Sequence, residues 1–265
     1  MKECLSDIII QIDGTEMKDW NGKDIQIARS KGGVIVVSNP LDNLISTGIN
    51  PWPTPEILQK LYQSRQVRAF EGEQLELAKA GIGYYCDLQS LHSEDAITWS
   101  VFGTVSHSSE EIRKRWTDTF LSLSNLPDIL SRGADIFLWR RIPHPDTLVS
   151  GGPEIDFGII TENALILGEA KWQSNVASSQ GKNKNKDQIM LRGEFLLKYA
   201  RRIFPKLSHH IVIGVGLSKE SFRSTVPDGV LFRSVAWEAV CGLNSHPLSD
   251  EVQRYFQWKK EHTKF

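Results

Sequence analysis

Cysteine is scarce in this 265-residue chain, which holds Cys4, Cys86 and Cys241 and no C-x-x-C pair. An odd number of cysteines without paired spacing argues against the disulfide framework of a secreted protein. It also argues against a zinc site built from cysteine ligands. The sequence therefore favours a reducing, cytoplasmic setting.

An excess of charge of one sign is also lacking: 31 Lys and Arg residues oppose 32 Asp and Glu residues, for a net charge of −1. A protein that binds DNA over its whole surface is usually basic, so any contact with nucleic acid must rely on locally concentrated positive charge. Long apolar runs are missing too, and the N-terminal MKECLSDIIIQIDG has only a short one between acidic residues. We expect neither a signal peptide nor a membrane span.

Hydrophobic residues make up 40% of the chain, which is enough for a substantial core. A Pro-rich break at residues 51–55 leads into an amphipathic helix predicted at 54–67. Apolar runs and helical periodicity along the rest of the chain predict an α/β protein with a mixed central sheet flanked by helices. The predicted strands are 7–12, 33–38, 135–140, 154–160, 164–171, 210–215 and 230–234, and the other predicted helices are 71–80, 93 onwards, 109–122, 187–203 and the AWEAVCGL segment.

Two of these strands, PEIDFGII and ALILGEAK, form a candidate hairpin around the polar turn TEN. If Glu162 and Asn163 are the two loop residues, counting outwards places Asp156 directly opposite Glu169. Directly opposed side chains share one face of a sheet, with Cβ atoms about 5 Å apart. Lys171 follows Glu169 by two residues and therefore points to the same face.

Opposed carboxylates repel each other, so this pairing does not serve the stability of the sheet. A divalent cation resolves the conflict, because carboxylates are suitable hard ligands for Mg²⁺ or Mn²⁺. Lys171 would then orient or deprotonate a water molecule, or stabilise the negative charge that develops on a phosphate. The same residues also fit a second interpretation, a solvated hairpin face with a cross-strand ion pair.

The order PEID, hairpin, GEAKW resembles the PD-(D/E)XK nuclease superfamily over roughly residues 93–240. One departure is that Glu154 and Ile155 separate Pro153 from Asp156, so the short PD form is not kept. The resemblance implies a restriction-endonuclease-like core, a nuclease domain at residues 91–265 and an N-terminal β/α addition of unknown role at 1–90.

The resemblance also implies roles for residues outside the hairpin. Glu94, with Asp95 as its rival, matches a helical metal ligand ahead of the strands, and the Ala170 carbonyl is a further candidate ligand. Gln188 matches an inward-facing glutamine after the lysine strand. Arg192 lies one helical turn further on and could meet a phosphate, and a solvated arginine is the alternative interpretation.

Basic residues stand close to the hairpin in the sequence, and these could supply local positive charge for nucleic acid. They are Lys182, Lys184 and Lys186 in an Asn-rich loop, and Arg140, Arg141 and His144 ahead of the first hairpin strand. A solvated loop and surface explain the same residues equally well.

We therefore expect a Mg²⁺- or Mn²⁺-dependent endonuclease that hydrolyses DNA. The resemblance implies a role in bacterial restriction or anti-phage defence, as a homodimer or with a partner subunit. One alternative is a catalytically silent nucleic-acid-binding or scaffolding subunit on the same fold. Another is an RNA-directed hydrolase, because the contacts that distinguish RNA from DNA cannot be located in the sequence.

Overall fold

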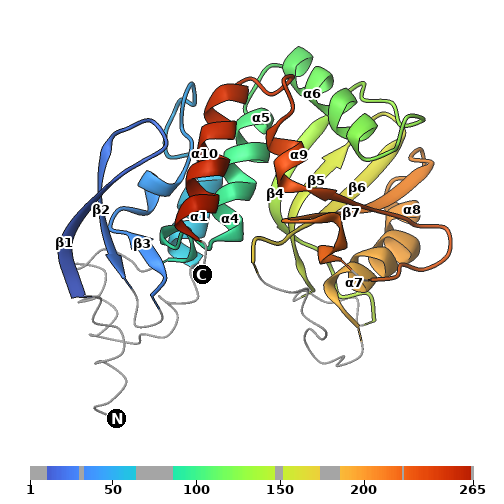
Figure 1. Ribbon diagram of the computed structural model, residues 1–265. Coiled ribbons are helices and arrows are strands. Elements are labelled where there is room, and N and C mark those ends of the chain that lie inside the picture. The colour runs from blue at the N-terminus through green and yellow to red at the C-terminus, as the bar shows by residue number, and fades with distance from the viewer. Residues whose placement is uncertain are drawn as a thin grey trace, which may run out of the picture. The chain divides into compact units, whose positions relative to one another are not determined.

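The computed structural model describes residues 11–29, 33–63, 86–146, 152–173, 186–222 and 224–263 (Figure 1). The predicted helix at 71–80, most of the strand at 7–12, Lys182 and Lys184 lie outside these residues. Contacts divide the chain into two units, Met1–Ser100 with Asp250–Phe265, and Val101–Ser249. The domain boundary that the sequence predicts near residue 90 stays a prediction.

The first unit contains an antiparallel sheet with the strand order β1-β2-β3. Residues 19–23 join the first two strands in a turn, in which Gly22 adopts the positive φ of 82° that favours glycine. The elements of this unit are β1 (Gln11–Lys18), β2 (Asp24–Arg29), β3 (Ile35–Val37), the short 3₁₀ turns at Pro40–Asn43 and Asp87–Gln89, and the helices α1 (Pro55–Gln63), α4 (Glu94–Thr98) and α10 (Ser249–His262).

Helix α10 begins with Asp250 and Glu251 and ends with basic residues, the charge order that the helix dipole favours. Its buried side supplies Tyr255 and Trp258, which both meet Trp20 edge-on at ring distances of 4.8 and 5.3 Å. Aromatic side chains separated by more than 230 residues therefore make one core in this unit.

The second unit holds a five-stranded mixed sheet with the order β4-β5-β6-β7-β8. The pairs from β4 to β6 are antiparallel and those from β6 to β8 are parallel. This confirms the expected mixed α/β class. The strands are β4 (Asp135–Arg141), β5 (Glu154–Ile160), β6 (Ala164–Ala170), β7 (His209–Gly216) and β8 (Leu231–Ala236), and the helices are α5 (Thr104–Ser106), α6 (Glu110–Leu123), α7 (Gln188–Phe195), α8 (Arg201–Ile203) and α9 (Trp237–Cys241), with π-helical segments at Trp99–Gly103 and Leu196–Ala200.

Helices cover both faces of the β4–β8 sheet (Figure 1). One face buries Leu165, Leu167 and Val212 against α7 and the π-helical segment that follows it. On the other face, Phe157 stacks on Phe102 at 3.8 Å. Trp116 and Phe120 of α6 continue this aromatic cluster.

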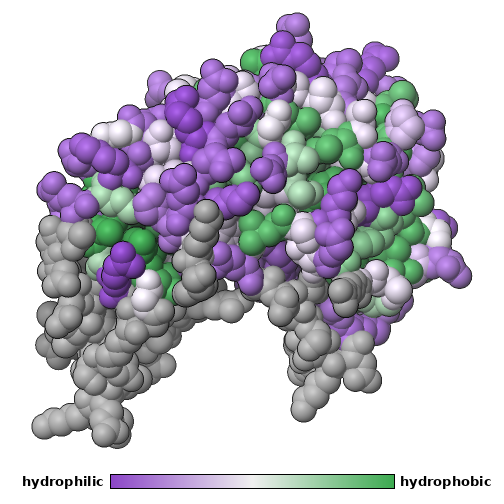
Figure 2. All heavy atoms as spheres, in the orientation of Figure 1, coloured by the Kyte–Doolittle hydropathy of each residue, from purple (hydrophilic) through white to green (hydrophobic). Residues whose placement is uncertain are grey.

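Helix α6 is amphipathic, as its sequence period predicts. Trp116 and Phe120 are fully buried, whereas Lys114 and Asp118 pair at 3.1 Å on the exposed side. Hydrophilic residues dominate its outer surface in Figure 2. Within the described residues, no helix is long and apolar enough to cross a membrane.

Candidate active site

The hairpin of β5 and β6 has the register that the sequence predicts. The ladder runs from the Ile160–Leu165 pair to the Phe157–Gly168 pair, and Asp156 and Glu169 are the next residues outwards on their strands. At the turn, the Thr161 N–H donates to the Ala164 carbonyl at 3.0 Å. Along β6, Glu169 therefore shares a face with Leu165 and Leu167, the face that α7 covers.

Glu169 is completely buried and lies between two cationic side chains. Lys171 Nζ is 2.7 Å from its Oε1, and the Arg192 guanidinium forms an ion pair with its Oε2. Neither carboxylate oxygen has a hydrogen bond of good geometry within the described residues. The attraction is therefore mainly one of charge, and a water-free environment strengthens it.

Arg192 extends from α7 and is fully buried. Its guanidinium donates to the backbone carbonyls of Gln188 at 3.0 Å and Glu154 at 2.8 Å. These two bonds and the Glu169 pair fix the side chain within the protein. The sequence left open a phosphate contact or a solvated side chain for Arg192, and the structure instead directs it to Glu169.

Lys171 stands where β6 ends. Its N–H donates to the Val215 carbonyl at 2.8 Å, and its own carbonyl accepts from Trp237 Nε1 at 3.0 Å. The backbone is thus held from β7 and α9, while the side chain keeps 10% of its surface exposed. The Lys171 side chain is thus slightly exposed, whereas that of Arg192 is fully buried.

Asp156 is half-buried, and its Oδ2 accepts a hydrogen bond from the Ala170 N–H at 2.6 Å. A charge-assisted bond of this kind fixes the carboxylate over the end of β6. Lys171 and Glu169 are in contact, whereas the meeting of Asp156 with this pair stays a prediction from the hairpin register. The predicted ligand role of the Ala170 carbonyl stays a prediction.

The neighbouring strand is irregular beside Asp156. Trp139 has φ 52°, in the left-handed region that bulky residues rarely adopt. The β4–β5 ladder pairs Leu138 with Phe157 and Arg140 with Ile155, and it has no pair between Trp139 and Asp156. Strained backbone of this kind concentrates at functional sites. No feature of the sequence pattern indicated it.

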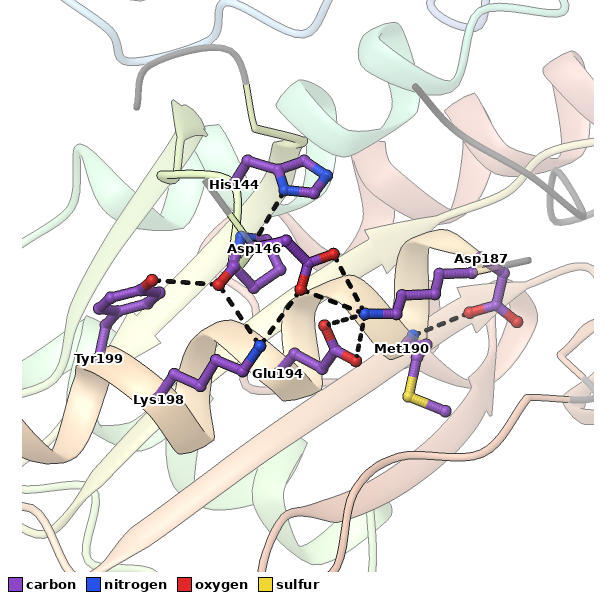
Figure 3. Close-up of polar contacts among 9 residues, drawn as sticks. His144, Asp146, Asp187, Met190, Glu194, Lys198 and Tyr199 are labelled. Atoms are coloured by element: carbon purple, nitrogen blue, oxygen red, sulfur yellow. Dashed lines mark hydrogen bonds and ion pairs between the residues drawn. The ribbon is translucent and has the colours of Figure 1, made fainter. Parts of the chain in front are cut away.

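Helix α7 begins beside this cluster. Asp187 caps it by accepting from the Met190 N–H at 2.8 Å (Figure 3). Among the described residues, none donates a hydrogen bond to the buried Oε1 of Gln188. The backbone carbonyl of the same residue accepts from Arg192.

The candidate ligands for a divalent cation are two carboxylates, those of Asp156 and Glu169. In the part of the chain that the structure describes, no group of three or more His, Cys, Asp or Glu residues could hold a metal. Mg²⁺ is, however, often bound by one or two carboxylates, with water and substrate phosphate completing its shell. Asp156 and Glu169 carry such oxygens, and both oxygens of Glu169 lack a hydrogen-bond donor among the described residues.

Glu94 belongs to the other unit, where it opens α4 after the Ser93 cap. It lies close enough to Lys259 to favour the charged form of that lysine. Its rival Asp95 pairs with Lys60 at 2.9 Å. The metal-ligand role of Glu94 stays a prediction.

The basic residues expected to bind nucleic acid have varied surroundings. Lys186 pairs with Asp146 at 3.2 Å and with Glu194 at 2.7 Å, and Lys198 joins the network through Asp146 (Figure 3). These pairs explain why the pKa of Lys186 is raised and that of Asp146 lowered. In contrast, Arg140 and Arg141 are exposed at the end of β4, and Arg141 lies 3.6 Å from Glu154.

The segment that holds His144 joins the same network. The Asp146 N–H donates to His144 Nδ1 at 3.2 Å, and Tyr199 donates to the Pro145 carbonyl at 3.1 Å (Figure 3). The network thus fastens residues 144–146 to the helical stretch that starts with α7. Comparison with protein-family models, curated proteins and solved structures gives no match for the chain.

Proposed function

We propose that the chain is a nuclease of the PD-(D/E)XK type that hydrolyses DNA phosphodiester bonds with Mg²⁺ or Mn²⁺. The observation that supports this function best is the buried Glu169 paired with Lys171 at the end of the hairpin, next to Ala170, whose N–H donates to Asp156. Burying such charges is costly, and hydrophobic residues in their place are often equally stable or more stable. A chemical role explains the arrangement better than stability does.

The fold of the second unit supports the same proposal. An antiparallel hairpin carries the acidic residues, α7 follows the lysine, and β7 pairs in parallel with β6. We propose that this is a restriction-endonuclease-like core. A homodimer or a partner subunit in a restriction or defence system belongs to the same proposal.

Asp156 and Glu169 would hold the cation, which polarises a phosphoryl oxygen and lowers the pKa of bound water. Lys171, whose side chain is 10% exposed beside the same carboxylate, would donate to the attacking water or to a phosphate oxygen. Its positive charge stabilises the negative charge that grows on the phosphate as water adds and the ester oxygen leaves. The Gln188 Oε1 can accept a hydrogen bond from a water molecule and so orient it.

The first test is cleavage of supercoiled plasmid, linear duplex, single-stranded DNA and RNA in Mg²⁺, Mn²⁺ or EDTA. Lys171→Met keeps the length of the side chain and removes its charge, and we expect it to lower the rate about 10²–10³-fold. Lys114→Met on the exposed side of α6 is the matched control and should cut like the wild type. Equal cutting by Lys171→Met and the wild type would refute the assignment, and cleavage of RNA alone would change the substrate.

One observation favours a second candidate, a silent nucleic-acid-binding or scaffolding module. Glu169 already has two cationic partners, so the cluster is neutralised without metal. For this candidate, calorimetry with Mn²⁺ should detect no binding, and every substrate should stay intact. Metal binding that is lost in Asp156→Asn would exclude it.

A further inference from the structure

The proposed chemistry assigns roles to Asp156, Glu169 and Lys171, but none to Arg192, which pairs with the same glutamate. It reaches the same carboxylate as Lys171, but it is fully buried and its position is fixed by two carbonyls. Arginine keeps its charge at every relevant pH, so it cannot relieve burial by losing a proton. It therefore needs an anion, and Glu169 is the carboxylate that it meets.

Glu169 has the converse need. Its carboxylate is fully buried, and an unpaired buried charge costs several kcal/mol. Lys171 takes one oxygen and Arg192 the other. Without metal, both oxygens of Glu169, the proposed metal ligand, therefore already have a cationic partner.

We infer that Arg192 is a positioning residue that acts as the internal counter-ion of Glu169 and competes with the divalent cation for that carboxylate. This inference rests on the proposed function. A cation that takes Glu169 as a ligand has to share or replace the guanidinium, and the two positive charges repel each other. Arg192 thus supports the metal-free fold and weakens metal affinity.

Competition with the divalent cation for Glu169 distinguishes this role of Arg192 from a purely structural one. A structural arginine stabilises the protein equally with and without metal. A competing arginine stabilises the metal-free protein most, so its removal increases the stabilisation that metal provides. The useful measurements are therefore the dissociation constant for Mn²⁺ and the midpoint of thermal unfolding in EDTA and in saturating Mn²⁺.

The variants are Arg192→Gln, which removes the charge and can still donate to the carbonyls, and Arg192→Lys, which keeps the charge. Arg202→Gln, an exposed arginine on α8, is the matched control. We expect Arg192→Gln to unfold at a lower temperature in EDTA, to gain more from Mn²⁺ than the wild type, and to bind Mn²⁺ at least about tenfold more tightly. Arg192→Lys and Arg202→Gln should bind Mn²⁺ like the wild type.

Two failures can be distinguished. If the wild type binds Mn²⁺ and folded Arg192→Gln binds it no more tightly, the competition is refuted while the proposed function stands. If neither protein binds Mn²⁺, the proposed function fails and this inference fails with it. If Arg192→Gln is too unstable to isolate, refolding decides: recovery in Mn²⁺ but not in EDTA supports the inference, and recovery in neither overturns it.

Discussion

At the scale of single residues, the protein buries a lysine away from the candidate site. Lys259 of α10 is completely buried, and its Nζ donates to the Leu91 carbonyl. Burial lowers the pKa of Lys259 from 10.5 to about 7, although the charge of Glu94 opposes this shift. This burial could not be predicted, because periodicity places a residue on a helix face without showing what covers the side chain.

The Lys259 pKa predicts how stability depends on pH. The folded-state pKa is lower than the unfolded-state pKa, so between about pH 7 and 10.5 the unfolded chain binds more protons. This group therefore makes the protein more stable as pH rises through that window, and its destabilising effect is complete below about pH 7.

Lys259→Met should raise the free energy of unfolding near pH 6.5 by about 1–4 kcal/mol. It should also flatten the rise in stability between pH 7 and 10, because no group remains at that position to titrate. Urea unfolding at four pH values measures both effects, with the partly exposed Lys260→Met as the control. Parallel pH profiles for Lys259→Met and the wild type would contradict the prediction.

Arg192 illustrates what residue spacing can and cannot predict. Four positions after Gln188, it lies on the same side of α7, as helical periodicity requires. Its partner was not predictable, because the Glu169 contact depends on how α7 packs over the end of β6. The sequence therefore identified an arginine near the site without identifying Glu169 as its partner.

At the scale of elements, the hairpin was the most predictable feature. Its register depends on a local turn and on a strict alternation of two, so the positions of Asp156 and Glu169 could be counted. Trp139 and the π-helical segments at Trp99–Gly103 and Leu196–Ala200 could not be found in this way. Each is a local departure from the regular period on which sequence interpretation relies.

Gly168 shows how tightly the hairpin packs. It pairs with Phe157, and a methyl group added to this glycine would overlap the Phe157 ring, which itself stacks on Phe102. Gly168→Ala should therefore destabilise the protein by about 1–3 kcal/mol, because the ring has no free space to move into. Chemical denaturation measures the change.

A double-mutant cycle tests that cause. Phe157→Leu shortens the obstructing ring, so its cost should be smaller in the Gly168→Ala background, with a coupling energy above about 0.5 kcal/mol. Phe137→Leu is the control, since this ring lies over Gly158 instead. Additive effects of Gly168→Ala and Phe157→Leu would show that the clash is not the origin of the instability.

At the scale of the whole molecule, the C-terminal helix α10 belongs to the same unit as the N-terminal strands. The predicted boundary near residue 90 followed from composition and motif order, which cannot reveal that α10 joins the first unit. The contacts responsible are Trp258 Nε1 with the Lys18 carbonyl at 2.9 Å, and the rings of Tyr255 and Trp258 with Trp20. No local pattern in a sequence encodes pairings over such separations.

The packing of α10 in the first unit predicts which segments become less stable when a residue of α10 is substituted. Trp258→Ala removes a buried ring and should cost about 3–5 kcal/mol. If the two units open separately, amide hydrogen exchange should become faster in residues 11–29 and 249–263 and change little in β5, β6 and β7. The neighbouring exposed Gln257→Ala is the control and should leave exchange unchanged. Equal acceleration in both units would instead show that the chain unfolds as a single cooperative block, and damage to α10 would then also destabilise the hairpin that carries Asp156 and Glu169.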